Sequence, residues 1–289
     1  MKKSKTRNAI LTRKLTESSL MVAFATVLGM LKLVEMPYGG SVTMASMLPI
    51  VIISYRSGIA MGLGSGLVFA VIQQLLGLNN LSYVTGWQSV LAVIFLDYVF
   101  AFTVVGFGGV FKGKINVFAT DFSKRQSVEL GTGMALVCFL RYLCHTIAGA
   151  TVWAGLSIPT EAALIYSIGY NATYMIPETL VSVIVSLWLG SVIDFSKNLP
   201  TRFLQTVQKD LKGAQCEIFK HFATILSVFA VAFDTILIAP HLQDQETGTL
   251  TFSNLGNVNW ILAGVVSAVL FAASIVLIAV AKKKEKSES

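Results

Sequence analysis

The chain has 289 residues, of which 54% are hydrophobic and only 13% are charged. A soluble domain carries about a quarter of its residues as charges, so this composition excludes an ordinary soluble fold. The net charge of +7 could suggest nucleic acid as a partner. Because the positive charges lie in short loops beside apolar runs, membrane topology explains them better, and we expect no nucleic-acid partner.

Eight apolar segments in chain order predict an all-α integral membrane protein. A spanning helix needs about 20 mostly apolar residues to cross about 30 Å of hydrocarbon. The second predicted segment is short, and the sixth is long enough to contain a break. The segments are 15–33, 46–56, 58–77, 88–111, 130–152, 163–194, 221–240 and 258–281.

The distribution of Lys and Arg predicts the orientation of these segments. If eight spans alternate, the basic tails and basic loops all fall on one side of the membrane. The four loops on the other side contain no Lys or Arg, and they are 34–45, 78–87, 153–162 and 241–257. This asymmetry predicts a multi-pass protein of a bacterial inner membrane, surrounded by lipid, with both termini in the cytoplasm.

The chain divides into a six-helix core, a basic linker and a two-helix extension. The core is expected over residues 1–195, the cytoplasmic linker over 196–220, and the extension of unknown role over 221–289. In the third segment, Gly58, Gly62 and Gly66 recur every four residues and therefore share one helix face. Such a face allows another helix to approach closely.

The sequence offers no catalytic constellation. Gly108–Lys114 matches most of a phosphate-binding loop, but Ile115 stands where a magnesium-binding hydroxyl is required, and a membrane helix precedes it. No motif for a metallohydrolase or a serine hydrolase is present, and the cysteines do not match a zinc or redox pattern. We therefore expect no enzyme activity, no cofactor and no metal, and any ATPase must be another chain.

Polar residues inside the predicted spans are the candidates for function, because a charge at mid-bilayer costs at least about 2.5–3.5 kcal/mol. Asp97 lies about nine residues into the fourth segment, and its alternative role is to pair with Arg141. His145 shares a face with Arg141, and its alternative is a bond to a backbone carbonyl. Asn171 lies beside Tyr166, where an interfacial aromatic belt is the alternative. One acid, one imidazole, one amide and several aromatic rings suit a flat organic cation.

The first 195 residues resemble the thiamine-specific S component of energy-coupling factor (ECF) vitamin transporters. Each carrying motif is short, but the order and spacing of the set are specific. The motifs are Met36-Pro37-Tyr38-Gly39-Gly40-Ser41-Val42-Thr43, Pro49 with Arg56-Ser57-Gly58, Leu96-Asp97-Tyr98, His145-Thr146-Ile147-Ala148-Gly149, Trp153, and Tyr166-Ser167 with Asn171. The last two segments have no counterpart in that family.

The resemblance implies a six-helix subunit that binds thiamine from outside and docks on one transmembrane coupling protein with two ATPase subunits. Asp97 would face the aminopyrimidine ring, and Tyr98 is its neighbour in the same motif. His145, Trp153, Tyr166 and Asn171 match binding positions around the two rings, and Trp87 takes the place of an aromatic residue in an outer loop. Ser19 and Ala23 fill the small-residue pair that contacts the coupling protein.

Two positions depart from the family pattern. The family acid is usually Glu, so Asp97 is one methylene shorter, and Gly40 stands where some members carry Trp. Tyr38 is then the candidate for the missing lid contact. Two alternatives to thiamine import follow: an S component for a different vitamin or a thiamine precursor, and a stand-alone secondary carrier driven by an ion gradient.

Overall fold

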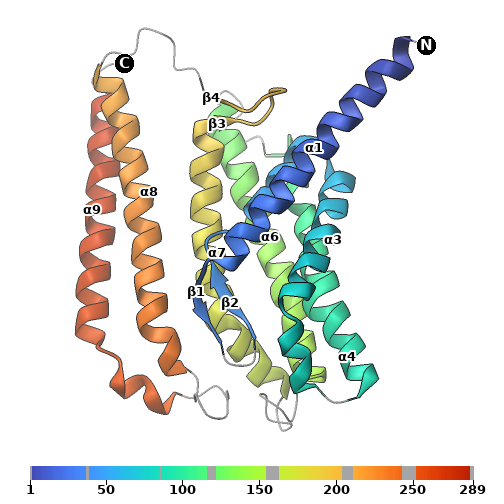
Figure 1. Ribbon diagram of the computed structural model, residues 1–289. Coiled ribbons are helices and arrows are strands. Elements are labelled where there is room, and N and C mark those ends of the chain that lie inside the picture. The colour runs from blue at the N-terminus through green and yellow to red at the C-terminus, as the bar shows by residue number, and fades with distance from the viewer. Residues whose placement is uncertain are drawn as a thin grey trace.

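The computed structural model describes residues 2–36, 39–84, 86–115, 122–153, 163–203, 211–242 and 252–286. Long helices dominate, joined by short helical turns and two small hairpins (Figure 1). The elements are α1 (Lys2–Met30), β1 (Lys32–Glu35), β2 (Ser41–Thr43), α2 (Leu48–Ser57), α3 (Ile59–Leu76), η1 (Leu78–Tyr83), α4 (Trp87–Val93), η2 (Ile94–Phe100), α5 (Ala101–Thr103), η3 (Val104–Gly109), α6 (Phe122–Thr151), α7 (Ala163–Val192), β3 (Ile193–Asp194), β4 (Thr201–Arg202), α8 (Leu211–Ile238), η4 (Ala239–Leu242), η5 (Ser253–Asn257) and α9 (Trp260–Lys286).

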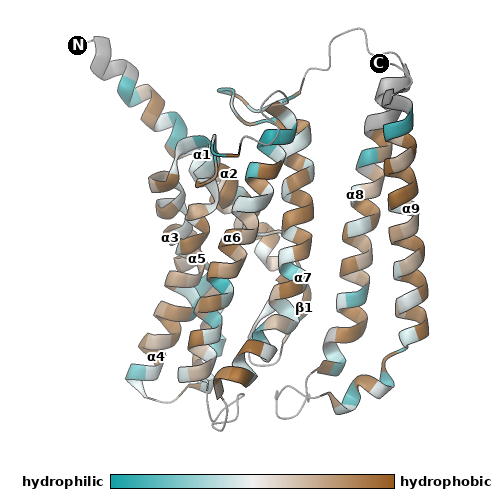
Figure 2. Cartoon of the chain, turned by 180° about the vertical axis from the view of Figure 1, so that it is seen from behind, coloured by the Kyte–Doolittle hydropathy of each residue, from teal (hydrophilic) through white to brown (hydrophobic). Residues whose placement is uncertain are grey.

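The helical membrane architecture predicted from the sequence is confirmed. Within the described ranges, six helices are long and apolar enough to cross a membrane, and hydrophobic residues predominate along them (Figure 2). The other two predicted spans are also helical: α1 has a basic first half, and α2 rises only about 15 Å over its ten residues. The six long apolar helices are Ile59–Leu76, Trp87–Gly109, Phe122–Thr151, Ala163–Val192, Ile218–Leu242 and Trp260–Lys283.

The short helix α2 lies at the centre of the core. Every residue from Leu48 to Tyr55 is buried, against α1, α3, α6 and the 87–109 segment. A helix that is apolar on all sides is stable only when neighbours cover all of it. Because α2 is enclosed in this way, it aligns the helices that surround the polar cavity described below.

Glycines allow the core helices to approach each other closely. A Cβ on Gly62 would lie 2.6 Å from the backbone oxygen of Gly106, and one on Gly66 would lie 2.9 Å from that of Phe102. The predicted close-approach face of α3 is therefore used by these two glycines. Gly58 has a different role, because it joins α2 to α3 with a φ of +97° and has open space around its Cβ position.

The segment predicted as an outer loop, 34–45, contains an antiparallel hairpin that the sequence did not indicate. Lys32 pairs with Thr43, Val34 with Val42, and Glu35 with Ser41. The turn between the strands includes Gly39 and Gly40, whose φ angles are +102° and +89°. Glycine adopts such angles without steric cost, so the chain can reverse tightly above α7.

The two C-terminal helices form an antiparallel pair beside α7 (Figure 1). The hydroxyls of Ser227 and Ser274 lie 2.9 Å apart, and Ser267 donates a 2.6 Å hydrogen bond to Asp234. Ser227 and Asp234 are seven residues apart on α8, and their partners Ser274 and Ser267 are seven residues apart in the reverse direction on α9. Helix α8 begins at Leu211, within the predicted 196–220 linker, because its polar first turns continue directly into the apolar run.

The start of α1 and the end of α9 lie at the same end of the molecule (Figure 1). At that end, the guanidinium of Arg56 bonds both carboxylate oxygens of Glu17 on α1. It also donates a 2.7 Å hydrogen bond to the backbone oxygen of Phe195, just after α7. The guanidinium of Arg56 thus ties the middle of α1 to the C-terminal ends of α2 and α7.

We predict that Gly62→Ala destabilises the protein by about 1–3 kcal/mol, because the added methyl group forces α3 away from Gly106. Gly64→Ala on the same helix is the matched control, since nothing lies within 4 Å of its Cβ position. The melting temperatures of both variants are measured by heating the proteins in detergent and monitoring the loss of folded protein by size-exclusion chromatography. Equal melting temperatures for the two variants would contradict this packing.

Candidate binding site

A cavity of about 420 Å³ lies between α3, the 87–109 segment, α6, α7 and the β1–β2 hairpin. Cavities of about 300–1,000 Å³ are typical of small-molecule sites. Its wall combines the polar side chains of Asp97, Arg141, His145 and Asn171 with several aromatic rings. A polar cavity inside a membrane protein requires that its charged groups find partners within the protein.

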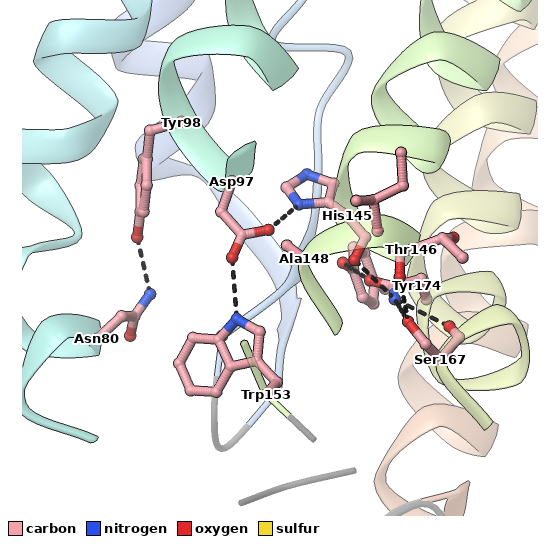
Figure 3. A network of polar contacts seen from close by, with 12 residues as sticks. Asn80, Asp97, Tyr98, His145, Thr146, Ala148, Trp153, Ser167 and Tyr174 are labelled. Atoms are coloured by element: carbon pink, nitrogen blue, oxygen red, sulfur yellow. Dashed lines mark hydrogen bonds and ion pairs between the residues drawn. The ribbon is translucent and has the colours of Figure 1, made fainter. Parts of the chain in front are cut away.

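Asp97 is the centre of the polar cluster in the cavity (Figure 3). His145 Nδ1 lies 2.8 Å from one carboxylate oxygen of Asp97, and Trp153 Nε1 donates a 2.9 Å hydrogen bond to the other. The Asp97 side chain keeps 15% of its surface exposed, toward the cavity. The carboxylate is therefore held by two donors and still accessible to a ligand.

The orientation of Asp97 follows from an irregularity in its helix. Residues 94–100 form a π-helical stretch between α4 and α5, and such widened turns are frequent at functional sites. Both Asp97 and the next residue, Tyr98, line the cavity. Asn80 Nδ2 donates a 2.9 Å hydrogen bond to the Tyr98 hydroxyl, which reaches 3.3 Å from the Gly77 oxygen.

Asn171 connects α6 and α7 at the same depth. Its amide nitrogen donates to the backbone oxygens of Ser167, at 2.8 Å, and His145, at 3.3 Å. Its amide oxygen accepts a 2.5 Å hydrogen bond from Tyr174. These three bonds satisfy the buried amide and fix the backbone from which the His145 ring extends.

The alternative reading of Asp97 as the ion-pair partner of Arg141 is wrong. Arg141 Nη1 lies 3.9 Å from Glu178 Oε1 and 3.6 Å from Met47 Sδ, and the guanidinium stacks 4.5 Å over the Phe102 ring. The positive charge of Arg141 is therefore compensated by Glu178. This leaves the Asp97 carboxylate to its neutral donors and to whatever enters the cavity.

The structure brings together five of the eight residues predicted to bind a ligand: Asp97, Tyr98, His145, Trp153 and Asn171 all line the cavity. Tyr166 lies on α7 among hydrophobic neighbours and not on the cavity wall. Trp87 begins α4, is 71% exposed and is also outside the wall. Tyr38 lies outside the described residues. A ligand-binding role for all eight residues stays a prediction.

Many residues of the cavity wall were not among the predicted binding residues, and Tyr170, Tyr174 and Asn80 are three of them. Tyr170 and Tyr174 follow Tyr166 at four-residue spacing on α7, and their rings lie edge to face, 6.3 Å apart. That four-residue spacing is the sequence signal that could have added Tyr170 and Tyr174 to the predicted binding residues. Asn80 lies on the short helix η1, whose position depends on the tertiary fold, so no local pattern indicates it.

His145 contributes a further acceptor atom beside the Asp97 carboxylate. Since an ionised carboxylate only accepts, His145 donates to Asp97 through Nδ1, and its neutral ring then presents Nε2 as an acceptor. His145 Nε2 is buried and has no hydrogen-bond partner within the described residues. A carboxylate, a free imidazole nitrogen and flanking aromatic rings can together bind a flat cation that carries an amino group.

Comparisons with known proteins identify the family of the chain. The model of the family described as thiamine transporter protein (Thia_YuaJ) matches residues 15–195. The chain belongs to this thiamine transporter protein family. The resemblance to thiamine-specific S components is confirmed at this level, and the chain is a multi-pass membrane protein of a transporter family.

Individual relatives cover the same part of the chain. The thiamine transporter ThiT of Bacillus subtilis (strain 168) is 33% identical over 175 residues, which are 60% of this chain and 87% of that protein. ThiT of Lacticaseibacillus paracasei is 23% identical over 177 residues, 58% and 82% of the two chains. A solved structure of ThiT from Listeria monocytogenes has a TM-score of 0.50 and 24% identity, covering 61% of this chain and 92% of that one, and it supports the fold.

The geometry at Gly40 yields a prediction for this site. A Cβ on Gly40 would lie 2.7 Å from the Tyr174 ring, whereas nothing lies within 4 Å of the same position on Gly86. Both glycines have positive φ angles, +89° and +87°. We expect Gly40→Ala to lower the stability by about 1–3 kcal/mol more than Gly86→Ala does, because only Gly40→Ala displaces a packed ring.

Thermal unfolding of the two variants without ligand measures this difference. A Gly40→Ala protein as stable as Gly86→Ala would show that the hairpin does not rest on Tyr174.

Proposed function

We propose that this chain is the thiamine-binding S component of an ECF-type importer. The observation that supports this most directly is the Asp97 carboxylate, held between Trp153 and His145 at the wall of a 420 Å³ cavity. It lies in the part of the chain that matches the thiamine transporter family.

The chemistry of thiamine suits the residues of the cavity. Thiamine joins an aminopyrimidine ring to a positively charged thiazolium ring. The amino group can donate to Asp97 and to the free Nε2 of His145. The thiazolium cation can lie against the rings of Tyr170 and Tyr174, with cation–π contacts of about 0.5–2 kcal/mol each when desolvated.

In such an importer, one subunit binds the vitamin and other subunits supply the energy. This chain's own residues bind and orient the vitamin, and a transmembrane coupling protein with two ATPase subunits supplies the energy. On α1, Ser19 and Ala23 are exposed, whereas Ser18, Val22 and Ala25 face the core. A face of small residues allows close helix approach, which supports α1 as the docking surface.

The orientation belongs to the same proposal. The basic residues gather at the end of the molecule where α1 starts and α9 finishes, and we place this end in the cytoplasm of a bacterial cell. The β1–β2 hairpin and the cavity mouth then face outward, so that thiamine enters from outside.

We predict that the purified chain binds thiamine and that Asp97→Asn weakens binding at least about tenfold. The substitution keeps the side-chain shape but removes the negative charge near the ligand cation. Asp234→Asn is the matched control: it also changes a hydrogen-bonded aspartate within a span, but on α8, away from the cavity. Isothermal titration calorimetry measures the thiamine affinity of the wild type, Asp97→Asn and Asp234→Asn.

Thiamine binding that survives Asp97→Asn unchanged would contradict the site. Folded wild-type protein that does not bind thiamine would contradict the proposed ligand. A thermal-shift panel of other vitamins and of the thiamine precursors would then identify the alternative, since the shorter acid and Gly40 alter the family's pocket.

We also predict that Ala23→Trp abolishes co-purification with the coupling protein and ATPase subunits while thiamine binding persists. The indole would prevent close approach to α1. Phe24→Trp is the control, because Phe24 is already a large, 54% exposed side chain on this helix. If the Ala23→Trp protein still assembles as well as Phe24→Trp does, this face of α1 is not the docking surface.

A further inference from the structure

The β1–β2 hairpin forms one wall of the cavity; β2 packs against one face of α7 and against α1, and β1 packs against α8. Gly39, Gly40, Ser41 and Thr43 all line the cavity from the hairpin side. The hairpin has only three paired positions. Because a short two-stranded ribbon is marginally stable alone, its position over the cavity depends on the helix beneath it.

Three side chains of α7, spaced four residues apart and therefore on one face, contact successive points of the hairpin. Tyr170 donates a 3.4 Å hydrogen bond to the Gly39 oxygen at the turn. The ring of Tyr174 packs where a Cβ of Gly40 would be. Glu178 accepts from both the backbone N–H and the hydroxyl of Thr43, the latter at 2.7 Å.

The contact at Glu178 differs from the other two in its chemistry. Glu178 is fully buried in the middle of a membrane helix, where an unpaired carboxylate would be costly. Two of its partners are donors of Thr43, and the third is Arg141 at 3.9 Å. If the hairpin lifted away, Glu178 would lose the two hydrogen bonds that Thr43 donates to it.

We propose that Glu178 is a positioning residue that latches the β1–β2 hairpin over the cavity through Thr43. Glu178 does not line the cavity, so it acts through the hairpin and not by contact with a ligand. The inference rests on the proposed function for its kinetic consequence, which is that the latch slows the escape of thiamine. The latch itself is a property of the protein without ligand.

The α7 face also provides a connection from the ligand-binding cluster to the latch. Tyr174 donates to Asn171, which in turn bonds the His145 backbone, and the rings of Tyr174 and His145 lie edge to face at 6.2 Å. A ligand that orders His145 and Asp97 therefore also orders the tyrosine on which Gly40 rests.

The first test measures hydrogen exchange of the hairpin amides in the full-length protein without ligand. Thr43→Val removes the hydroxyl donor at nearly constant shape, and we expect exchange over residues 32–43 to be about tenfold faster. Thr43→Ser keeps the donor and should restore the slow exchange. Glu178→Gln, which weakens both bonds from the acceptor side, should change the same amides in the same direction.

Thr179→Val is the matched control, because Thr179 is the neighbour of Glu178 on α7 and its hydrogen bonds go to the Met175 oxygen and to Cys138 of α6, not to the hairpin. Exchange of residues 32–43 that is unchanged in both Thr43→Val and Glu178→Gln would overturn the latch. Faster exchange spread over the whole core would equally overturn it, since that result reports general destabilisation.

The second test measures thiamine association and dissociation separately by stopped-flow fluorescence. We expect Thr43→Val to release thiamine about tenfold faster, with a smaller change in association, and Thr43→Ser and Thr179→Val to match the wild type. An unchanged dissociation rate in Thr43→Val would overturn the kinetic role. Wild-type protein that does not bind thiamine would instead overturn the proposed function, while the exchange experiment still decides the latch.

Discussion

A carboxylate inside a bilayer must find donors within the protein, and Asp97 finds both of them on a neighbouring segment. His145 lies within α6 and Trp153 directly follows it, so the hydrogen bonds of Asp97 hold the 87–109 segment against the C-terminal end of α6. Asn171 then secures the His145 backbone from α7. The geometry of the cavity depends on this chain of bonds, because each helix contributes one polar group that the next helix satisfies.

A second buried acid, Glu178, lies beside Arg141 of the cavity wall and accepts hydrogen bonds from Thr43 of the hairpin. Its pairing with Arg141 leaves Asp97 without a neutralising cation, and its bonds to Thr43 fix the hairpin. The two acids therefore have complementary roles. Asp97 faces the cavity and keeps part of its surface exposed, whereas Glu178 lies behind the wall, fully buried, and positions the residues around it.

The helices could be predicted from the sequence because about 20 apolar residues have few alternatives in a membrane. Asp97, His145 and Asn171 were identifiable because polar residues at such depth require a reason. The hairpin could not be predicted, since its three paired positions gain their stability from α7 and not from local propensity. The partners of Arg141 and Glu178 could not be predicted, because they lie on other elements, and single-sequence spacing does not indicate such pairs.

The most direct test of the central claim is an experimental structure of the chain with thiamine bound. The account predicts the aminopyrimidine ring beside Asp97 and His145, the thiazolium ring near Tyr170 and Tyr174, and the hairpin closed on α7 with Thr43 bonded to Glu178. Thiamine bound elsewhere, with Asp97 and the His145 ring making no contact to it, would contradict the account.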